Sequence, residues 1–295
     1  MVSSKQPVDY HAGARGSRLI AMVLRISLFL LAGTPLGRAS AADPNLEHPT
    51  HLVTVAREGY SIAGIATHLE GISKFKYGIA LFPGNPGILR ARESNGEIRH
   101  TMVGNFLIRS RRHWLDEDIL VLSVDAPSDK WEGFAQAFRE TDRYGQDVAA
   151  LLKEAGRRFG IADWTLVGTS EGSISAFHAA RMQPEIARRV ILTSSLFQPN
   201  RNGSGLSGAD FTQLKMPLLW VHHADDPCPV TAYTDAVAFA KRSNAPLVTV
   251  RGGGPGQGLA CQARTAHGFI GIEQATVLAM RSWVKTGKVP GDIGP

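Results

Sequence analysis

Between residues 77 and 286 the chain alternates short apolar runs with longer stretches of helical character. The runs are rich in Val, Ile and Leu, which is typical of strands buried on both faces of a parallel sheet. Helices must then cover both faces of that sheet. The pattern therefore predicts one doubly wound α/β domain. The expected strands are residues 77–82, 118–126, 164–170, 189–195, 217–225 and 246–251, and the expected helices lie near 104–118, 140–159, 171–183, 231–243 and 272–286.

Two further strand-like runs precede this alternation, HLVTVAR (51–57) and SIAGIATHL (61–69). Only a Glu-Gly-Tyr turn separates them, which predicts an antiparallel hairpin at the edge of the sheet. The connection at 196–215 is rich in Gly, Ser and Asn and has no helical period, so it reads as irregular. It is too short to form a large lid domain, and we expect an open cleft.

The N-terminal region has the composition of a secretory signal peptide. Arg15 and Arg18 precede the run LIAMVLRISLFLLAG, and a small-residue cleavage pattern follows at 39–41. The uninterrupted apolar stretch falls short of the roughly 20 residues that a membrane-spanning helix needs. We therefore expect residues 1–41 to be a signal peptide, with Met22 as an alternative start, and residues 42–295 to be a periplasmic or secreted domain without a stable membrane anchor.

The positive charge of the chain belongs mostly to this leader. The whole sequence has a formal net charge of +6, and residues 1–41 carry five basic side chains and one acidic one, so the remainder has +2. No run of Lys and Arg with interleaved aromatics is left after residue 41, so nucleic-acid binding has no support. The expected partner is a small-molecule substrate.

The stretch LVGTSEG (166–172) places Ser170 between two glycines, where an expected strand turns into an expected helix. This is the context of the Gly-x-Ser-x-Gly elbow, which holds a nucleophilic serine on a sharp turn. A serine hydroxyl is a poor nucleophile unless a base removes its proton and a third group orients that base. The elbow therefore requires a histidine and an acid elsewhere in the chain.

Both residue types follow in the sequence. PLLWVHHADDPCP places Asp225 and Asp226 just past the end of a later strand, where ligand-facing loops lie in open parallel sheets. RTAHGF then places His267 in a loop before the last expected helix. With VGTSEG, VHHADDPCP and TAHGF in the order Ser, Asp, His, the chain resembles the α/β-hydrolase superfamily over about residues 51–288.

That resemblance implies a catalytic triad, with Ser170 as the nucleophile, His267 as the general base and acid, and an aspartate that orients the imidazole. Two spacing rules of the family select different aspartates. The rule anchored to the strand end, with His222-His223 in place of His-Gly, selects Asp226, whereas the spacing to a later proline selects Asp225. We favour Asp226 and keep Asp225 as the alternative acid.

The resemblance also implies an oxyanion hole built from two backbone N–H groups. One belongs to Glu171, directly after the nucleophile, and the other comes from the loop LFPGNPG (81–87). The family often has His-Gly where this chain has Pro83-Gly84, and the register then makes Asn85 the second donor.

The only two cysteines, Cys228 and Cys261, lie in the part expected to be exported. An even count in an oxidising compartment favours one disulfide over two separate thiols. On the triad map, such a bridge would join the loop that carries the acid to the loop that carries His267.

Other patterns have less specific interpretations. GGGPGQG (252–258) fits neither the Gly-x-Gly-x-x-Gly spacing nor the Walker pattern of nucleotide-binding loops, and we interpret it as a flexible loop. The basic cluster at 109–113 reads as a solvated helix face, and His178 as a core histidine. A zinc site is an alternative without supporting spacing; its candidate ligands are His222, His223, Asp225, Asp226, Cys228, Cys261 and His267.

The expected activity is the cleavage of carboxylic esters through an acyl-enzyme, with no cofactor. Thioesterases, amidases and peptidases use the same triad and stay open as alternatives. A non-catalytic binding protein of this fold is a further alternative, because fold alone does not establish function.

Overall fold

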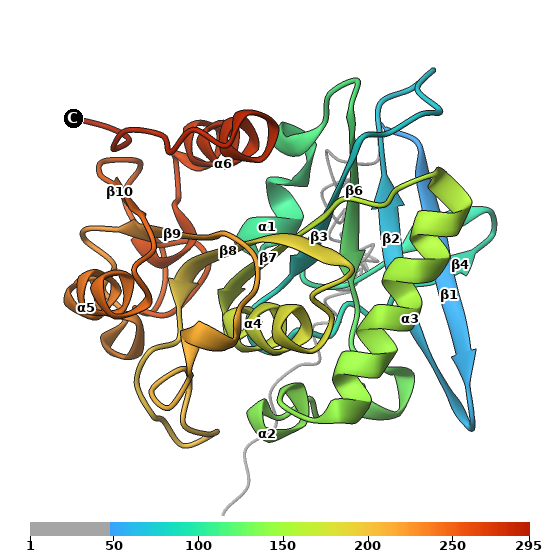
Figure 1. Ribbon diagram of the computed structural model, residues 1–295, viewed down its shortest axis with the longest axis horizontal. Coiled ribbons are helices and arrows are strands. Elements are labelled where there is room, and N and C mark those ends of the chain that lie inside the picture. The colour runs from blue at the N-terminus through green and yellow to red at the C-terminus, as the bar shows by residue number, and fades with distance from the viewer. Residues whose placement is uncertain (1–47) are drawn as a thin grey trace, which may run out of the picture. The chain divides into compact units, whose positions relative to one another are not determined.

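The computed structural model describes residues 48–295 (Figure 1). The expected signal peptide lies outside this range. No described helix combines the length and apolar character needed to cross a lipid bilayer. The strands are β1 Thr50–Arg57, β2 Tyr60–Thr67, β3 Tyr77–Phe82, β4 Arg92–Ser94, β5 Glu97–Arg99, β6 Ile119–Val124, β7 Trp164–Ser170, β8 Ala187–Ser195, β9 Leu218–His223 and β10 Leu247–Val250. The α-helices are α1 Phe106–Arg109, α2 Gln136–Arg139, α3 Asp142–Phe159, α4 Gly172–Met182, α5 Tyr233–Ser243 and α6 Glu273–Thr286.

Eight of the described strands form one sheet in the order β1-β2-β6-β3-β7-β8-β9-β10. Strands β6, β3, β7, β8, β9 and β10 run parallel, whereas β1 and β2 form an antiparallel hairpin and β2 is antiparallel to β6. The expected doubly wound, mostly parallel sheet and its edge hairpin are therefore confirmed. Strands β4 and β5 form a separate two-stranded ribbon that the sequence pattern did not predict.

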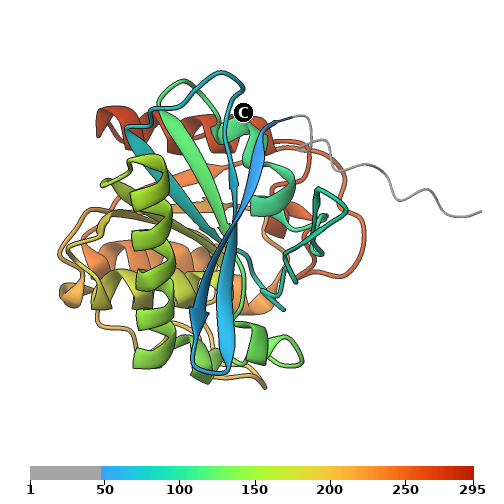
Figure 2. The same cartoon turned by 90° about the vertical axis from the view of Figure 1, so that its right-hand side faces the viewer.

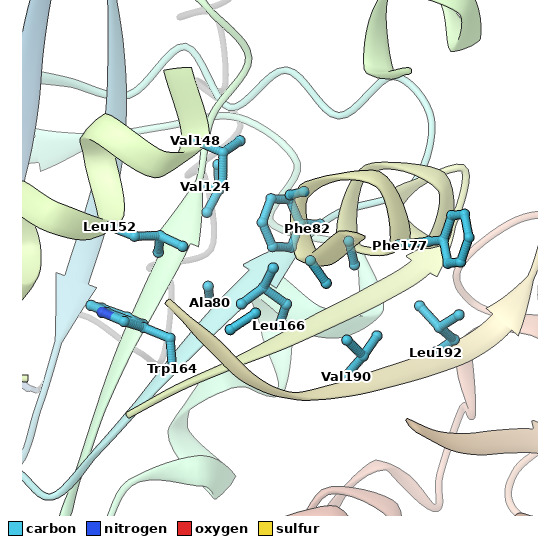
Figure 3. Close-up of a cluster of buried hydrophobic side chains, with 14 of the residues drawn as sticks. Ala80, Phe82, Val124, Val148, Leu152, Trp164, Leu166, Phe177, Val190 and Leu192 are labelled. Carbon is cyan, nitrogen blue, oxygen red and sulfur yellow. The ribbon is translucent and has the colours of Figure 1, made fainter. Parts of the chain in front are cut away.

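Each face of the sheet has its own hydrophobic core, because successive strand residues point to opposite faces. On one face, Ala80 and Phe82 of β3 belong to a cluster that includes residues of α3, α4 and α5 (Figure 3). On the other face, Ile79 and Leu81 pack in a cluster with residues of α1 and α6. Figure 2 shows α3 beside the β1–β2 hairpin, at the edge of the sheet that β1 forms.

Three of the longer helices, α3, α5 and α6, end at residues in the left-handed conformation. Helix α3 begins after Thr141, whose hydroxyl accepts a hydrogen bond from the Tyr144 N–H, and it ends at Gly160 with φ 72°. Asn244 with φ 50° ends α5, and Gly287 with φ 70° ends α6. These caps fix where each helix returns the chain to the sheet.

The prediction of a single helix near 104–118 is wrong. The structure has the short helix α1 and then the 3₁₀ turn η1 (Arg111–Trp114), separated at Ser110. At Ser110 the backbone leaves helical geometry, with φ −98° and ψ 2°, and the Ser110 hydroxyl donates to the Phe106 carbonyl at 2.6 Å. The segment 196–215 is mostly irregular as expected, with one short 3₁₀ turn, η3 (Phe211–Gln213).

Candidate active site

Ser170 lies at the end of β7, immediately before Glu171 and helix α4, and has φ +53°. This left-handed conformation costs energy for a residue with a Cβ and requires support from the surroundings. The two flanking glycines give that support. A Cβ on Gly168 would collide with the Gly172 carbonyl, and a Cβ on Gly172 would collide with the Phe82 carbonyl of β3. The backbone of the elbow therefore packs too closely for any other residue.

His267 and Asp226 meet next to each other although they are far apart in the sequence. Asp226 follows β9, and His267 lies in the 3₁₀ turn η5 (Ala266–Gly268) before α6. His267 Nδ1 is 3.0 Å from Asp226 Oδ2. Since Nδ1 faces a carboxylate, the neutral imidazole carries its proton there and leaves Nε2 as the basic nitrogen.

Asp225 points elsewhere. Its residue is exposed, and its backbone N–H donates to His223 Nδ1 at 3.0 Å. The structure thus brings Asp226, the favoured acid of the two, into contact with His267. Of the two adjacent histidines, only His222 contacts Asp226, with its Nε2 3.4 Å from Oδ2. His223 Nε2 instead hydrogen-bonds the Gly252 carbonyl at 2.9 Å.

The Asp226 carboxylate is fully buried but well supplied with donors. Oδ1 accepts from the Cys228 N–H at 2.9 Å, and Oδ2 accepts from the Thr231 hydroxyl at 2.9 Å. Burial alone would raise the pKa of this carboxyl, but the hydrogen bonds from His222 and His267 outweigh burial and hold the pKa below its usual range. The acid is therefore ionised whenever the imidazole needs an orienting charge.

Ser170 and His267 line the same cavity of about 70 Å³. Gly84, Asn85 and Phe106 form other parts of its wall. Among the described residues no hydrogen bond joins the Ser170 hydroxyl to His267, a looseness that is common before a substrate is bound. The nucleophile candidate and the base candidate therefore face one small space.

The loop after β3 approaches the elbow closely. A Cβ on Gly84 would lie 2.8 Å from Ser170 Cβ and 3.0 Å from the Thr169 carbonyl oxygen, so only glycine fits without displacement. Asn85 follows, exposed and facing the cavity. The two residues expected to supply the oxyanion hole, Asn85 and Glu171, are also linked by their side chains, since Asn85 Nδ2 donates to Glu171 Oε2 at 3.2 Å.

Cys228 and Cys261 form the expected disulfide, with 4.6 Å between their Cα atoms. Cys228 lies two residues after Asp226, and Cys261 lies in the segment that leads to His267. The bridge removes both thiols from the zinc alternative. Within residues 48–295 no group of three or more His, Cys, Asp and Glu side chains is arranged to hold a metal ion.

The structure also shows contacts that the sequence reading missed. Thr231 lies between the acid and the base, with its hydroxyl oxygen 3.2 Å from His267 Nδ1. Arg109 donates to the Gly268 carbonyl at 2.6 Å and pairs with Glu273 at 2.9 Å. The solvated face assigned to the basic cluster is therefore wrong for Arg109, and also for Arg111, which is 1% exposed.

The sequence motifs around Ser170 and His267 contain no signal for the contacts of Thr231 and Arg109, because these contacts join segments far apart in the chain. The distance from Arg109 to Gly268 along the sequence is more than half of the described part. His178, interpreted as a core histidine, lies outside the site and is only partly buried. It lines a second cavity of about 270 Å³ together with Glu140 and Arg181.

Comparison with known proteins agrees with this fold. No protein-family model matches the chain, and no curated protein matches its sequence. Among solved structures, the chain is similar to Est1E from Butyrivibrio proteoclasticus, with a TM-score of 0.54 and 13% identity over 79% of this chain and 97% of that one. It is also similar to an alpha-beta serine hydrolase homologue from Coxiella burnetii, with a TM-score of 0.51 and 16% identity over 79% and 95% of the two chains. The sheet order, the covering helices and these likenesses show that the chain has the α/β-hydrolase fold.

Proposed function

We propose that this chain is a serine hydrolase that cleaves carboxylic esters through an acyl-enzyme. Ser170 Oγ attacks the ester carbonyl while His267 Nε2 takes the hydroxyl proton and then gives it to the leaving alcohol. Asp226 holds the imidazole and stabilises its charged form. A water molecule activated by His267 then releases the acid and restores the serine.

The oxyanion that forms in both steps needs donors already aimed at it. In this proposal they are the backbone N–H groups of Asn85 and Glu171, on either side of Ser170. Removing one such donor from a serine hydrolase costs about 3–4 kcal/mol of transition-state stabilisation.

The observation that carries the proposal is the contact between His267 and a buried Asp226 beside the strained Ser170 elbow. A carboxylate that is fully buried costs free energy unless its partners repay the loss of solvation. Asp226 Oδ2 accepts from Thr231 at 2.9 Å and faces His267 Nδ1 at 3.0 Å, so this arrangement serves to orient an imidazole. A binding protein without activity has no need of it.

Short-chain esters are favoured over long-chain lipid esters, because the described part of the chain has no large lid over the site. The segment 196–215, between β8 and β9, contributes only one short 3₁₀ turn to the described structure, so it forms no large lid over the cavity. Thioesters, amides and peptides require the same nucleophile and base, and they are the second group of candidates. The similar protein from Coxiella burnetii is itself described as a serine hydrolase homologue.

The test is labelling with a fluorophosphonate together with hydrolysis of a substrate panel. We expect the wild-type protein to be labelled, and Ser170→Ala to abolish both labelling and turnover. The panel contains p-nitrophenyl esters of increasing chain length, a thioester and an aminoacyl anilide. Full ester hydrolysis by Ser170→Ala, or no hydrolysis of any panel member by the folded wild type, would overturn the proposal.

A further inference from the structure

The side chain of Glu171 is buried directly after the nucleophile, where a negative charge needs an explanation. Its residue is only 4% exposed. Three neutral donors reach its carboxylate from three different segments: Asn85 Nδ2 at 3.2 Å, Asn202 Nδ2 at 3.1 Å and Gln136 Nε2 at 3.3 Å. All of them use the carboxylate as an acceptor, so it is not free to bind a substrate.

The fourth partner of Glu171 is a buried cation. Arg139 of α2 has a side chain that is 1% exposed, and its Nη2 is 3.5 Å from Glu171 Oε2. The guanidinium also lies over the ring of Phe134, 3.9 Å from its centroid. A charge buried this deeply is stable only with a counter-charge and with hydrogen bonds to most of its N–H groups, which here are made by Nη1 and Nη2 but, among the described residues, not by Nε. Glu171 supplies that counter-charge.

The same guanidinium holds the loop that follows β3. Arg139 Nη2 donates to the Pro86 carbonyl at 3.0 Å, and Nη1 donates to the Ser175 hydroxyl at 3.0 Å. Gly87 packs directly on the guanidinium, because a Cβ there would lie 2.8 Å from Nη2. Glu171 thus holds the side chain of Asn85, and Arg139 holds the backbone one residue later.

A second buried carboxylate anchors the far end of this loop. Asp125, after β6, accepts hydrogen bonds from the backbone N–H groups of Leu89 at 2.6 Å and Ala91 at 2.8 Å. The loop from Pro83 to Ala91 is therefore fixed at its end by Asp125 and at its start by the Glu171–Arg139 pair.

We propose that Glu171 and Arg139 are positioning residues that hold the loop so that the Asn85 N–H faces the oxyanion. This inference rests on the proposed serine mechanism. Arg139 also balances the Glu171 charge, since an unpaired carboxylate next to Ser170 would repel the negative charge that develops on the substrate oxygen. The elbow motif itself assigns no function to the Glu171 side chain, and this proposal gives it one.

The experiment compares Glu171→Gln, Arg139→Met and the double variant with p-nitrophenyl acetate as substrate. Glutamine keeps the size of Glu171, but its amide nitrogen cannot accept the hydrogen bonds made to one carboxylate oxygen. We expect kcat to fall by about 10- to 100-fold, less than for outright loss of an oxyanion donor, while KM changes little. We expect a larger loss for Arg139→Met, which leaves the carboxylate unpaired, and a partial recovery in the double variant.

Asp147 of α3 provides a matched control. It is another fully buried carboxylate, paired with Arg57 at 2.8 Å and bonded by Tyr60 at 3.0 Å, and none of these three residues lines the Ser170 cavity. We expect Asp147→Asn to lower the melting temperature without lowering kcat at 25 °C. If Glu171→Gln behaves in the same way, its role is only structural and the inference is overturned.

Hydrogen exchange of peptides that cover residues 83–91 gives a readout that does not depend on activity. We expect faster exchange in Glu171→Gln than in wild type, with β3 and β7 unchanged. If the wild type hydrolyses no ester but the loop loosens, the serine mechanism fails while the contact of Glu171 with the loop is supported. Unchanged exchange in this loop overturns the positioning role, whatever the activity.

Discussion

At the scale of single residues, Thr231 contacts both Asp226 and His267, which act together in the proposed mechanism. Its buried hydroxyl lies 2.9 Å from Asp226 Oδ2 and 3.2 Å from His267 Nδ1. A hydroxyl has one proton to donate and two lone pairs, so it can donate to the carboxylate and still accept from the imidazole. It therefore restricts the rotation of both side chains at once.

We expect Thr231→Val to lower kcat by about tenfold, the equivalent of about 1.4 kcal/mol, because the isosteric side chain removes this hydroxyl and leaves the packing intact. Stability should fall by roughly 1–3 kcal/mol, since a buried carboxylate loses a donor. Thr231→Ser keeps the hydroxyl and is the control. Steady-state kinetics and urea unfolding measure both effects, and equal kinetics for the valine and serine variants would contradict this role.

Single residues were partly predictable from the sequence. The elbow motif located Ser170 because two close backbone contacts at Gly168 and Gly172 restrict the sequence to a recognisable pattern. The choice between Asp225 and Asp226 was harder, since the two spacing rules disagree by one residue. What separates them in the structure is local folding, in which Asp226 turns back to accept from the Cys228 N–H.

At the scale of elements, the disulfide joins two loops that the sheet alone does not connect. Cys228 lies beside the start of the 3₁₀ turn η4 (Pro229–Thr231), and Cys261 lies in the long connection from β10 to α6. The sequence separation of the two cysteines is 33 residues. The connection includes the glycine-rich stretch 252–258, whose residues are all exposed.

We expect the double variant Cys228→Ser/Cys261→Ser to lose roughly 3–4 kcal/mol of stability, by the chain-entropy argument for a loop of this length. Activity should fall at the same time, because the bridge joins the Asp226 loop to the segment that carries His267. Thermal melting and ester hydrolysis, with and without a reducing agent, measure both effects. Unchanged melting after complete reduction, with two thiols titrated, would contradict the expectation.

The strands of the parallel sheet were predictable because each is a run of apolar residues buried on both faces. The short elements were not. Helix α1 spans only Phe106–Arg109, a single turn that is too short to give a helical period in the sequence. Strands β4 and β5 have three residues each, with Ile98 as the only apolar side chain among them, so they are too short to show a periodic pattern.

At the scale of the whole molecule, the stability of the fold depends on pH through groups outside the site. Burial, followed by the charge of Arg181, lowers the pKa of His178 to about 4 from its ordinary 6.5. Glu140 faces the same cavity, and burial raises the pKa of its carboxyl. The unfolded chain therefore takes up a proton on His178 at a pH at which the folded chain does not.

The contribution of His178 to stability should consequently fall as the pH drops from about 6.5 to about 4, with no slope from His178 above that window, while the raised pKa of Glu140 acts in the opposite direction. We expect His178→Gln to remove this part of the dependence. The measurement is urea unfolding of both proteins at a series of pH values. A constant difference between their unfolding free energies from pH 7 to pH 4 would show that His178 titrates equally in both states.

The overall architecture was the most predictable level, since the strand and helix pattern, the order Ser, Asp, His and the absence of a large lid segment all point to one fold. Tertiary pairings were not predictable. Arg139 and Glu171 form a buried pair although they are 32 residues apart, and Arg109 contacts Gly268 although they are 159 residues apart in the chain. Such pairs depend on three-dimensional proximity and have no fixed spacing along the chain.

The order in which the site residues occur along the chain has a consequence for the protein during its synthesis. A growing polypeptide presents Ser170 and its elbow long before Cys261 and His267 have been synthesised. Until that last stretch has arrived and docked, the serine has no base and Cys228 has no partner. In the proposed mechanism, a nascent chain that ends before His267 therefore cannot hydrolyse a substrate. Activity begins only after the segment that carries His267 has been synthesised and has folded against the sheet.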